Sequence, residues 1–331
     1  MSEALPRRAA RAPDAQRRRG LRTAAALMLG FSVRPLSGWA ADSGAPRRVV
    51  VLNWELTETL LALGVAPVGI PLPDWYRNTV AVPPLPRGVA DVGLLYQPNF
   101  DVLLALKPDL LIVTPGHASL QTPLQRIAPT LTLGAYMSAP RPYAGLCDET
   151  ATMARALGVP ARATALIAST NNAIADTAAS LHSRSGHLAD SAPPRSVIVA
   201  DVVDERHVRV YAAGSLFDEV LGRLGVINAA NPPGAPMARW AANAMGTATV
   251  PLQRLLDVSH ADLLLVGPLD PAVRVSLTAS PLWRALPAAR SRRVAVLPVI
   301  APYGGLVSMQ RFAEGAVAAL AAIDAGGDGL G

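Results

Sequence analysis

The chain has few of the residue types that form disulfides and metal sites. Among 331 residues it has one cysteine, Cys147, which cannot close an internal disulfide and has no accompanying histidine motif. We therefore expect a buried, inert thiol. The histidines show neither metal-finger spacing nor a dense cluster with Asp and Glu, so no metal site is predicted. They are His117, His182, His187, His207 and His260.

Excess positive charge is also missing beyond the N-terminus, although the whole chain has a formal net charge of +6. Residues 1–40 contain eight arginines and two acids, so the remaining chain has 22 basic and 22 acidic residues. A neutral chain offers no basic stripe for phosphates. We therefore expect no nucleic-acid partner.

The apolar run near the N-terminus, residues 23–33, is too short to span a bilayer comfortably. Arg18 and Arg19 precede it, and a small-x-small site follows at residues 38–40. This pattern is typical of a bacterial export signal, here of the twin-arginine kind. A retained membrane anchor is the weaker alternative, and no cysteine marks a lipoprotein junction. The sequence predicts a soluble periplasmic protein whose mature form begins near Ala41.

Motifs of common enzyme classes are absent as well. The chain has no Gly-x-Ser-x-Gly elbow, no HExxH, no Gly-x-Gly-x-x-Gly and no Walker pattern. Asp201, Asp204 and Glu205 gather after a predicted strand, but a solvated loop explains them better than catalysis. We expect no enzyme, and a periplasmic enzyme is kept as a remote alternative.

What the chain does contain is an alternation of short apolar runs and helical stretches, typical of parallel sheets covered by helices. An Ala-rich stretch predicts one long helix over about residues 161–183. The predicted fold class is α/β, with two Rossmann-like lobes of parallel-type sheets joined by that single long α-helix. The predicted division is a signal peptide (1–40), an N-terminal lobe (41–143), a helical segment with the inter-lobe helix and linker (144–194) and a C-terminal lobe (195–331).

Short stretches in a shared order and spacing carry a family resemblance. They are ETLLALGV at 58–65, PPLP at 83–86, DVGL at 91–94, PN at 98–99, KPD at 107–109, RIAP at 126–129, RH at 206–207, SLF at 215–217, PLW at 281–283 and YG at 303–304. With these stretches the chain resembles the periplasmic ferric-hydroxamate siderophore-binding proteins, the soluble receptors of ATP-driven iron importers. The resemblance implies a monomer that captures a ferric siderophore in a cleft between its lobes and delivers it to an inner-membrane ABC permease.

A siderophore surrounds Fe(III) with its own oxygens, so the resemblance implies no protein metal ligand and no cofactor. The protein needs aromatic walls for the organic shell and donors for the iron-bound oxygens. Each aromatic candidate has ordinary packing as its alternative. The candidate ligand-binding residues are Trp54, Trp75, Tyr76, Tyr96, His117, Trp240 and Tyr303, with Arg77, Arg206 and Arg209 as candidate cations.

Two departures from the family pattern bear on the ligand. Relatives carry an arginine donor where this chain has Leu95, and a tyrosine donor at the position of His117. The loss of arginine removes a charge-assisted hydrogen-bond donor. His117 is either a replacement donor, through a ring nitrogen, or a loop histidine without a role in binding. A receptor for cobalamin, haem or another iron chelate is therefore the alternative, with His117, Tyr96 or Tyr303 available to bind haem iron.

A third departure concerns docking. Family receptors present one acid per lobe to arginines of the permease, but the matching positions here are Thr122 and Gln253. Asp257 or Glu219 is expected to substitute, unless docking uses a different pattern.

Overall fold

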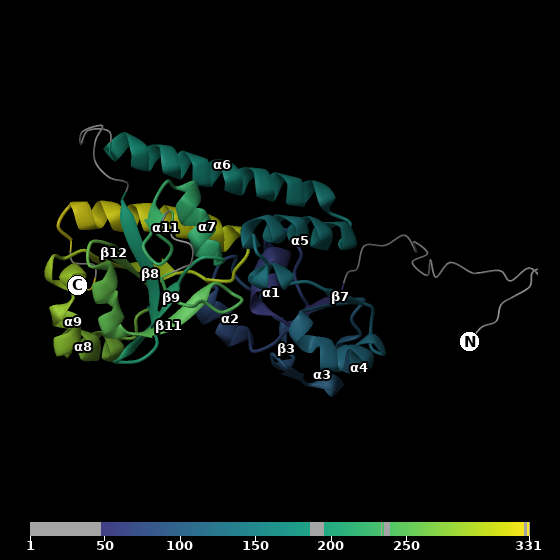
Figure 1. Ribbon diagram of the computed structural model, residues 1–331. Helices are drawn as coiled ribbons and strands as arrows, with labels where there is room; N and C mark the ends of the chain where they lie inside the picture. The colour runs from purple at the N-terminus through teal and green to yellow at the C-terminus, as the bar shows by residue number, and fades with distance from the viewer. Residues whose placement is uncertain (1–47, 186–194, 233, 235–238, 328–329, 331) are drawn as a thin grey trace, which may run out of the picture. The chain divides into compact units, whose positions relative to one another are not determined.

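The computed structural model describes residues 48–185, 195–232, 234, 239–327 and 330, and two sheets organise them (Figure 1). The predicted export signal lies outside the described residues. In the first sheet, all neighbouring strands are parallel, in the order β3-β2-β1-β6-β7. Its strands are β1 (Val49–Val51), β2 (Gly69–Ile70), β3 (Ala90–Asp91), β6 (Leu110–Val113) and β7 (Thr130–Thr132); a separate hairpin consists of β4 (Gly93–Leu94) and β5 (Gln97–Pro98).

The second sheet is mixed, which differs from the parallel-type sheet expected. Its order is β11-β9-β8-β12-β13, with β10 also paired to β8. β9 runs antiparallel to both β8 and β11, because a short turn at residues 203–206 joins β8 to β9 and permits only an antiparallel pair. The strands are β8 (Ser196–Val202), β9 (His207–Tyr211), β10 (Ile227–Asn228), β11 (Thr247–Pro251), β12 (Asp262–Gly267) and β13 (Val294–Val299).

One long helix, α6 (Pro160–Ser185), links the two sheets, as the sequence predicts. Figure 1 shows it above both sheets, with α5 and α11 packed beneath it. The other helices are α1 (Trp54–Ala62), α2 (Pro73–Thr79), α3 (Phe100–Leu106), α4 (Gln121–Gln125), α5 (Pro142–Ala156), α7 (Leu216–Arg223), α8 (Pro271–Ala279), α9 (Pro281–Ala285), α10 (Pro287–Arg290) and α11 (Leu306–Asp324), with 3-10 turns η1 (Pro115–Leu120), η2 (Ala135–Ser138) and η3 (Leu252–Val258).

Strand periodicity divides the core. Val49 and Val51 of β1 join one buried cluster while Val50 joins another, because successive side chains point to opposite faces. The first of these clusters continues across both sheets, where the rings of Phe217 and Phe312 stack with centroids 3.9 Å apart. The described residues accordingly belong to one compact unit, and the predicted lobe boundaries stay a prediction.

Helix α11 is long and apolar enough to cross a membrane by length and composition. In this structure it packs against α6, α7 and β13, and Met309, Phe312 and Leu320 are buried in the shared core. Helices in a protein core reach the same length and apolar composition. The burial of α11 therefore accounts for its hydropathy.

Candidate ligand-binding site

The first sheet brings four predicted site residues to one edge. Trp54 follows β1, Trp75 follows β2, Tyr96 follows β3 and His117 follows β6. Parallel strands end at the same edge, and the carboxyl ends of such strands are the usual ligand side of α/β sheets. Trp54, Trp75 and His117 lie in the first turns of α1, α2 and η1, and Tyr96 lies in the turn between β4 and β5; their role in binding stays a prediction.

Trp54 and Trp75 form a stacked pair. Trp54 starts α1, where the Asn53 side chain accepts the amide hydrogen of Leu56 as the N-cap. Its indole N–H donates to the carbonyl oxygen of Pro71 over 2.7 Å. Its ring lies 5.5 Å from that of Trp75, at an interplanar angle of 27°. Because Trp75 is 52% exposed, the pair presents a fixed aromatic surface to solvent.

His117 supports Tyr96 and is not a free donor. Its Nδ1 lies 3.2 Å from the Thr114 amide and 2.9 Å from the Thr114 hydroxyl, and its Nε2 lies 2.7 Å from the Leu95 carbonyl oxygen. Because an amide must donate, Nδ1 is the acceptor and Nε2 carries the proton. The ring, 1% exposed, lies 5.2 Å from the ring of Tyr96, which is 56% exposed. Both ring nitrogens are thus engaged: Nδ1 fixes the ring to Thr114, and Nε2 holds the hairpin that displays Tyr96.

The second sheet contributes a charged group at the ends of β8 and β9. Asp201 and Arg209 are paired across these strands, with the guanidinium 3.4 Å from the carboxylate. The Tyr211 hydroxyl donates to the same carboxylate over 2.5 Å. Burial raises the pKa of Asp201, although Tyr211 and Arg209 both favour its ionised form. Arg209 stays partly exposed and is therefore available to an anionic ligand.

Tyr303 joins the two edges. It follows β13, and its backbone carbonyl accepts a hydrogen bond of 2.7 Å from the Tyr136 hydroxyl. Burial raises the pKa of the Tyr303 hydroxyl, a hydrogen bond with Thr247 lowers it, and the charges of Arg209, Asp201 and Glu55 also act on it. Tyr136 lies in η2 after β7 of the first sheet, so its hydrogen bond links that part of the chain to the segment after β13.

The other predicted residues lie elsewhere. Tyr76 is completely buried, and its hydroxyl donates to the Pro83 carbonyl oxygen over 2.8 Å, so it is a core residue. Trp240 is 6% exposed and packs in the second-sheet core, where its indole N–H has no hydrogen-bond partner among the described residues. Arg77 pairs with Asp74 on the surface of α2, and Arg206 is exposed in the β8–β9 turn. Among the described residues, the side chains of these four form no hydrogen bond, ion pair or ring contact with Tyr303 or the Trp54–Trp75 pair, and their role in binding stays a prediction.

The sequence pattern predicts Asp201 as part of a solvated loop. It does not identify Tyr136, Tyr211 or Glu55 as residues of the candidate site. Asp201 and Tyr211 are connected by the strand register, and Tyr136 reaches Tyr303 across 167 positions. The sequence pattern that could have predicted the Asp201 group is an acid followed by an antiparallel strand with Arg-x-Tyr. No local pattern could have predicted the hydrogen bond between Tyr136 and Tyr303.

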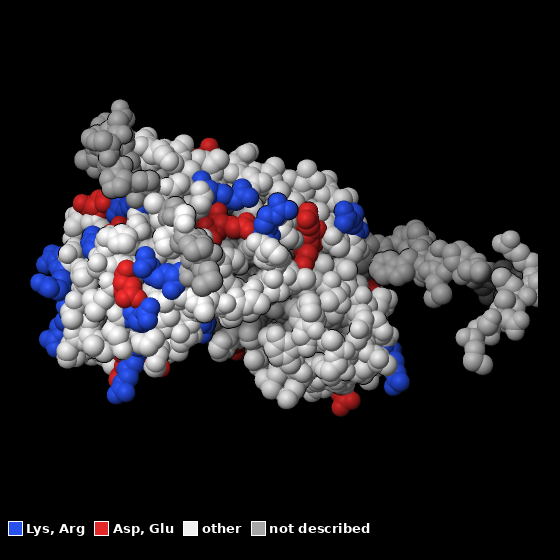
Figure 2. All heavy atoms as spheres, in the orientation of Figure 1, with Lys and Arg blue, Asp and Glu red and all other residues white. Residues whose placement is uncertain are grey.

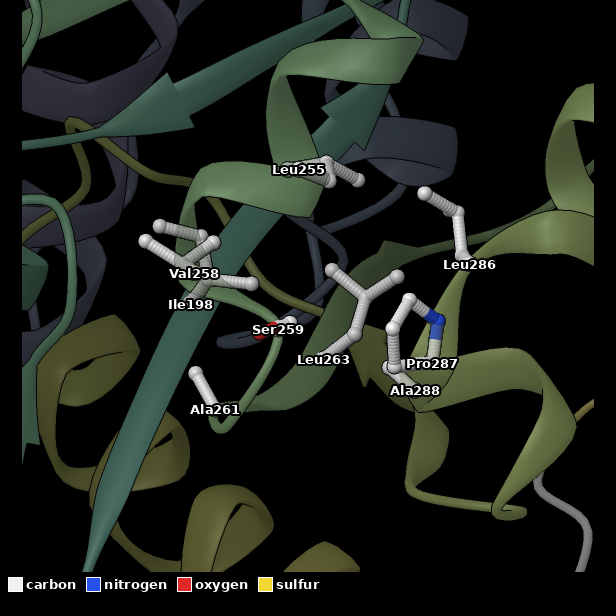
Figure 3. Close-up of a pocket in the computed structure, with 9 residues that line it drawn as sticks. All are labelled: Ile198, Leu255, Val258, Ser259, Ala261, Leu263, Leu286, Pro287 and Ala288. Atoms are coloured by element: carbon white, nitrogen blue, oxygen red, sulfur yellow. The ribbon is translucent and has the colours of Figure 1, made fainter.

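The cavities of the second sheet do not coincide with this site. The cavity in Figure 3 is enclosed by apolar side chains such as Ile198, Leu255 and Leu263, and its volume of about 10 Å³ holds at most one water molecule. A larger cavity of about 270 Å³ lies between Val202, Glu205 and α8. Because Val202 and Asp201 are neighbours on one strand, that cavity opens on the opposite face from the Asp201 group.

Charge and metal ligands are sparse around the first sheet. On the face drawn in Figure 2, charged side chains gather over α5 to α7 and over the second-sheet part, whereas the surface over α3 and α4 is mostly uncharged. No group of three or more His, Cys, Asp or Glu side chains that could hold a metal occurs among the described residues. Cys147 is half-buried, and burial raises the pKa of its thiol.

The chain is similar to known proteins in sequence and in fold. A family model described as "Periplasmic binding protein" matches residues 49–301. The iron(3+)-hydroxamate-binding protein FhuD of Escherichia coli is 30% identical over 269 residues, covering 81% of this chain and 84% of that protein. The Fe(3+) dicitrate-binding periplasmic protein FecB of E. coli is 27% identical over 76% of each chain.

Solved structures show the same fold. FhuD from Vibrio cholerae, crystallised with Fe3+–Desferal, is 28% identical with a TM-score of 0.72, covering 84% of this chain and 98% of that one. Staphylococcus aureus SirA, complexed with staphyloferrin B, is 20% identical with a TM-score of 0.59 over 84% of this chain and 94% of that one, and shows the likeness of fold alone.

Proposed function

The chain belongs to the periplasmic binding protein family, and on this premise we propose that it captures a ferric siderophore of the hydroxamate type for an ABC importer. The observation that supports this best is the exposed aromatic surface of Trp54, Trp75 and Tyr96 at the strand ends, in a chain similar to FhuD over most of its length. Aromatic rings suit the organic shell of a preassembled chelate.

Arg209 is the cation that we assign to the ligand. Leu95 contributes no donor, and both nitrogens of His117 are engaged within the protein. Arg209 is held by Asp201, remains partly exposed and acts electrostatically on Tyr303. A guanidinium there can donate to the partly negative oxygens around Fe(III). The iron arrives as part of the substrate, and we propose neither a resident cofactor nor catalysis.

A ferric carboxylate chelate is the second candidate. It is favoured by the similarity to FecB, whose name gives dicitrate as its ligand, and by the same arginine. Haem is less suited to this site, because His117 would have to break its contacts with Thr114 and Leu95 to reach iron.

Export and docking complete the proposal. We propose export by the twin-arginine route to the periplasm, action as a monomer, and delivery to an inner-membrane permease. Thr122 and Gln253 carry no charge for docking. Asp257 already pairs with Arg254 over 2.7 Å, and Glu219 is partly buried beside Arg223 and Tyr143. Docking through either acid would therefore compete with these local contacts.

Tryptophan fluorescence tests the proposal. The periplasmic form is titrated with ferrioxamine B, its iron-free chelator and ferric citrate in parallel. We expect saturable quenching by the ferric hydroxamate with Kd of about 1 μM or below, and weaker binding of the iron-free form. Tighter binding of ferric citrate would favour the second candidate. An absence of saturable quenching by any ferric chelate would exclude both.

A further inference from the structure

Helix α11 begins without a cap of its own. Its N-cap residue is Gly305, and no side chain of the preceding segment accepts an amide hydrogen of its first turn. The first amides of a helix need acceptors, and buried amides without them are costly. The acceptor comes from Glu58 in α1, which is distant in sequence.

Glu58 is fully buried and contacts this helix end through both oxygens. Oε1 accepts the Ser308 amide hydrogen over 2.7 Å, and Oε2 accepts the Ser308 hydroxyl hydrogen over 2.7 Å. The Gly305 amide donates as well. A carboxylate at a helix N-terminus also interacts favourably with the helix dipole. The contact therefore joins α1, beside the first sheet, to the helix that follows the second.

Two glycines permit this approach. A Cβ at Gly304 would lie 2.6 Å from Oε2 of Glu58, and one at Gly305 would lie 2.7 Å from the Thr59 hydroxyl. Real Cβ atoms do not approach so closely, so a side chain at either position would displace the Glu58 carboxylate or the Thr59 hydroxyl. The YG stretch at 303–304 thus has a steric reason for its second residue.

The segment held in this way carries Tyr303. Glu58 fixes the chain just after Tyr303, and the Tyr136 hydroxyl fixes the Tyr303 carbonyl itself. We propose that Glu58 is a positioning residue: by capping α11 from α1, it holds the segment that carries Tyr303 in place and so shapes the ligand-facing surface. This inference rests on the proposed function for its ligand readout only.

The contact can form in both protonation states of Glu58. Burial raises the pKa of Glu58 to about 7, and the charge of Glu55 on the same helix raises it further, whereas the contacts with Ser308 and Gly305 lower it. The Glu58 charge in turn raises the pKa of the neighbouring hydroxyls of Tyr76 and Tyr136. When Glu58 is protonated, the Ser308 hydroxyl can accept instead of donate. An amide reproduces this arrangement, because its oxygen accepts from the backbone and its nitrogen donates to Ser308. Glu58→Gln should therefore keep the cap, and Glu58→Ala should lose it.

Three variants test the role: Glu58→Ala, Glu58→Gln and, as a control on an exposed acid of α11, Glu314→Gln. We expect Glu58→Ala to weaken ferrioxamine B binding about tenfold, and Glu58→Gln and Glu314→Gln to bind within about twofold of wild type. Wild-type affinity in a folded Glu58→Ala variant would overturn the proposal. So would an equal loss in Glu58→Gln and Glu58→Ala.

Hydrogen exchange supplies a readout that needs no ligand. Amides of residues 301–309 should exchange faster in Glu58→Ala than in wild type and be unchanged in Glu314→Gln. If Glu58→Ala does not fold, Ser308→Ala, which removes the hydroxyl contact alone, should show the faster exchange in the same peptide. Unchanged exchange there would refute the cap. Faster exchange in a protein that binds no ferric chelate would retain the cap and refute the proposed function.

Discussion

Replacing Glu58 by Gln is expected to make the protein more stable than wild type at alkaline pH, although it removes a buried charge that accepts hydrogen bonds. Burial outweighs the contacts from Ser308 and Gly305 and raises the pKa of Glu58 from 4.5 to about 7. Each unit of difference between folded and unfolded pKa corresponds to about 1.4 kcal/mol. The carboxyl group therefore contributes about 3 kcal/mol of pH-dependent stability.

The sign follows from proton binding. The folded protein binds the proton of Glu58 more tightly than the unfolded chain does, so the stabilisation is fully present below about pH 4.5 and is lost as the pH rises through about 7. Gln does not titrate. The unfolding free energy of Glu58→Gln minus that of wild type should thus rise with pH, by about 3 kcal/mol between about pH 4.5 and pH 8.

Urea unfolding at about pH 5, 6, 7 and 8 measures this difference, with equal m-values as the check that both proteins unfold alike. Glu149 and Asp201 also have pKa values raised by burial, but they are common to both proteins and cancel. Glu55, whose charge raises the pKa of Glu58, is part of the difference that is measured. Glu314→Gln is the matched control and should follow the wild-type curve. Parallel curves for wild type and Glu58→Gln would refute the reasoning.

Other changes separate binding from folding. Trp75→Ala should lower the affinity for a ferric chelate about tenfold and cost about 1 kcal/mol of stability, because the exposed ring loses only its stacking on Trp54; titration and urea unfolding measure the two effects. Arg209→Gln should weaken binding of anionic ferric citrate more than that of a cationic ferrioxamine, and equal losses in parallel titrations would count against a charge contact. His117→Ala should destabilise the fold by about 2 kcal/mol, because it leaves the buried Thr114 amide without an acceptor; a thermal midpoint equal to wild type would contradict this. Phe217→Ala should cost about 3–5 kcal/mol in urea unfolding through the loss of its stack on Phe312, with ligand affinity preserved in the folded fraction.

The aromatic candidates show where sequence reasoning stopped. Trp75 and Tyr76 are neighbours with the same local signal, a Pro-rich loop after a short strand. Both lie in α2, which turns Trp75 to solvent and Tyr76 into the core, where the Tyr76 hydroxyl donates to the Pro83 carbonyl oxygen. Neighbouring side chains of a helix point in different directions, and this decided which of the two rings is buried. A prediction that both residues lie in a loop gives no such direction.

His117 and Glu58 show the same limit in another form. The sequence offered His117 as a donor to the ligand, because nothing local indicated that its nitrogens would meet Thr114 and Leu95. Glu58 lay within a stretch that carried the family resemblance, yet its partner Ser308 is 250 positions away. Such contacts depend on how distant helices and strands pack together. The periodicity of the sequence does not predict that packing.

The sequence by itself determined the α/β class, the long linking helix and the family. Periodicity, caps and motif order depend on residues that are close in sequence, so they can be recognised before the chain is folded. Tertiary structure alone decided which polar groups remain available to a ligand. Hydrogen-bonding capacity is finite: His117 is used by Thr114 and Leu95, and Glu58 by the end of α11, whereas among the described residues the rings of Trp75 and Tyr96 and the Arg209 guanidinium stay exposed to a ligand.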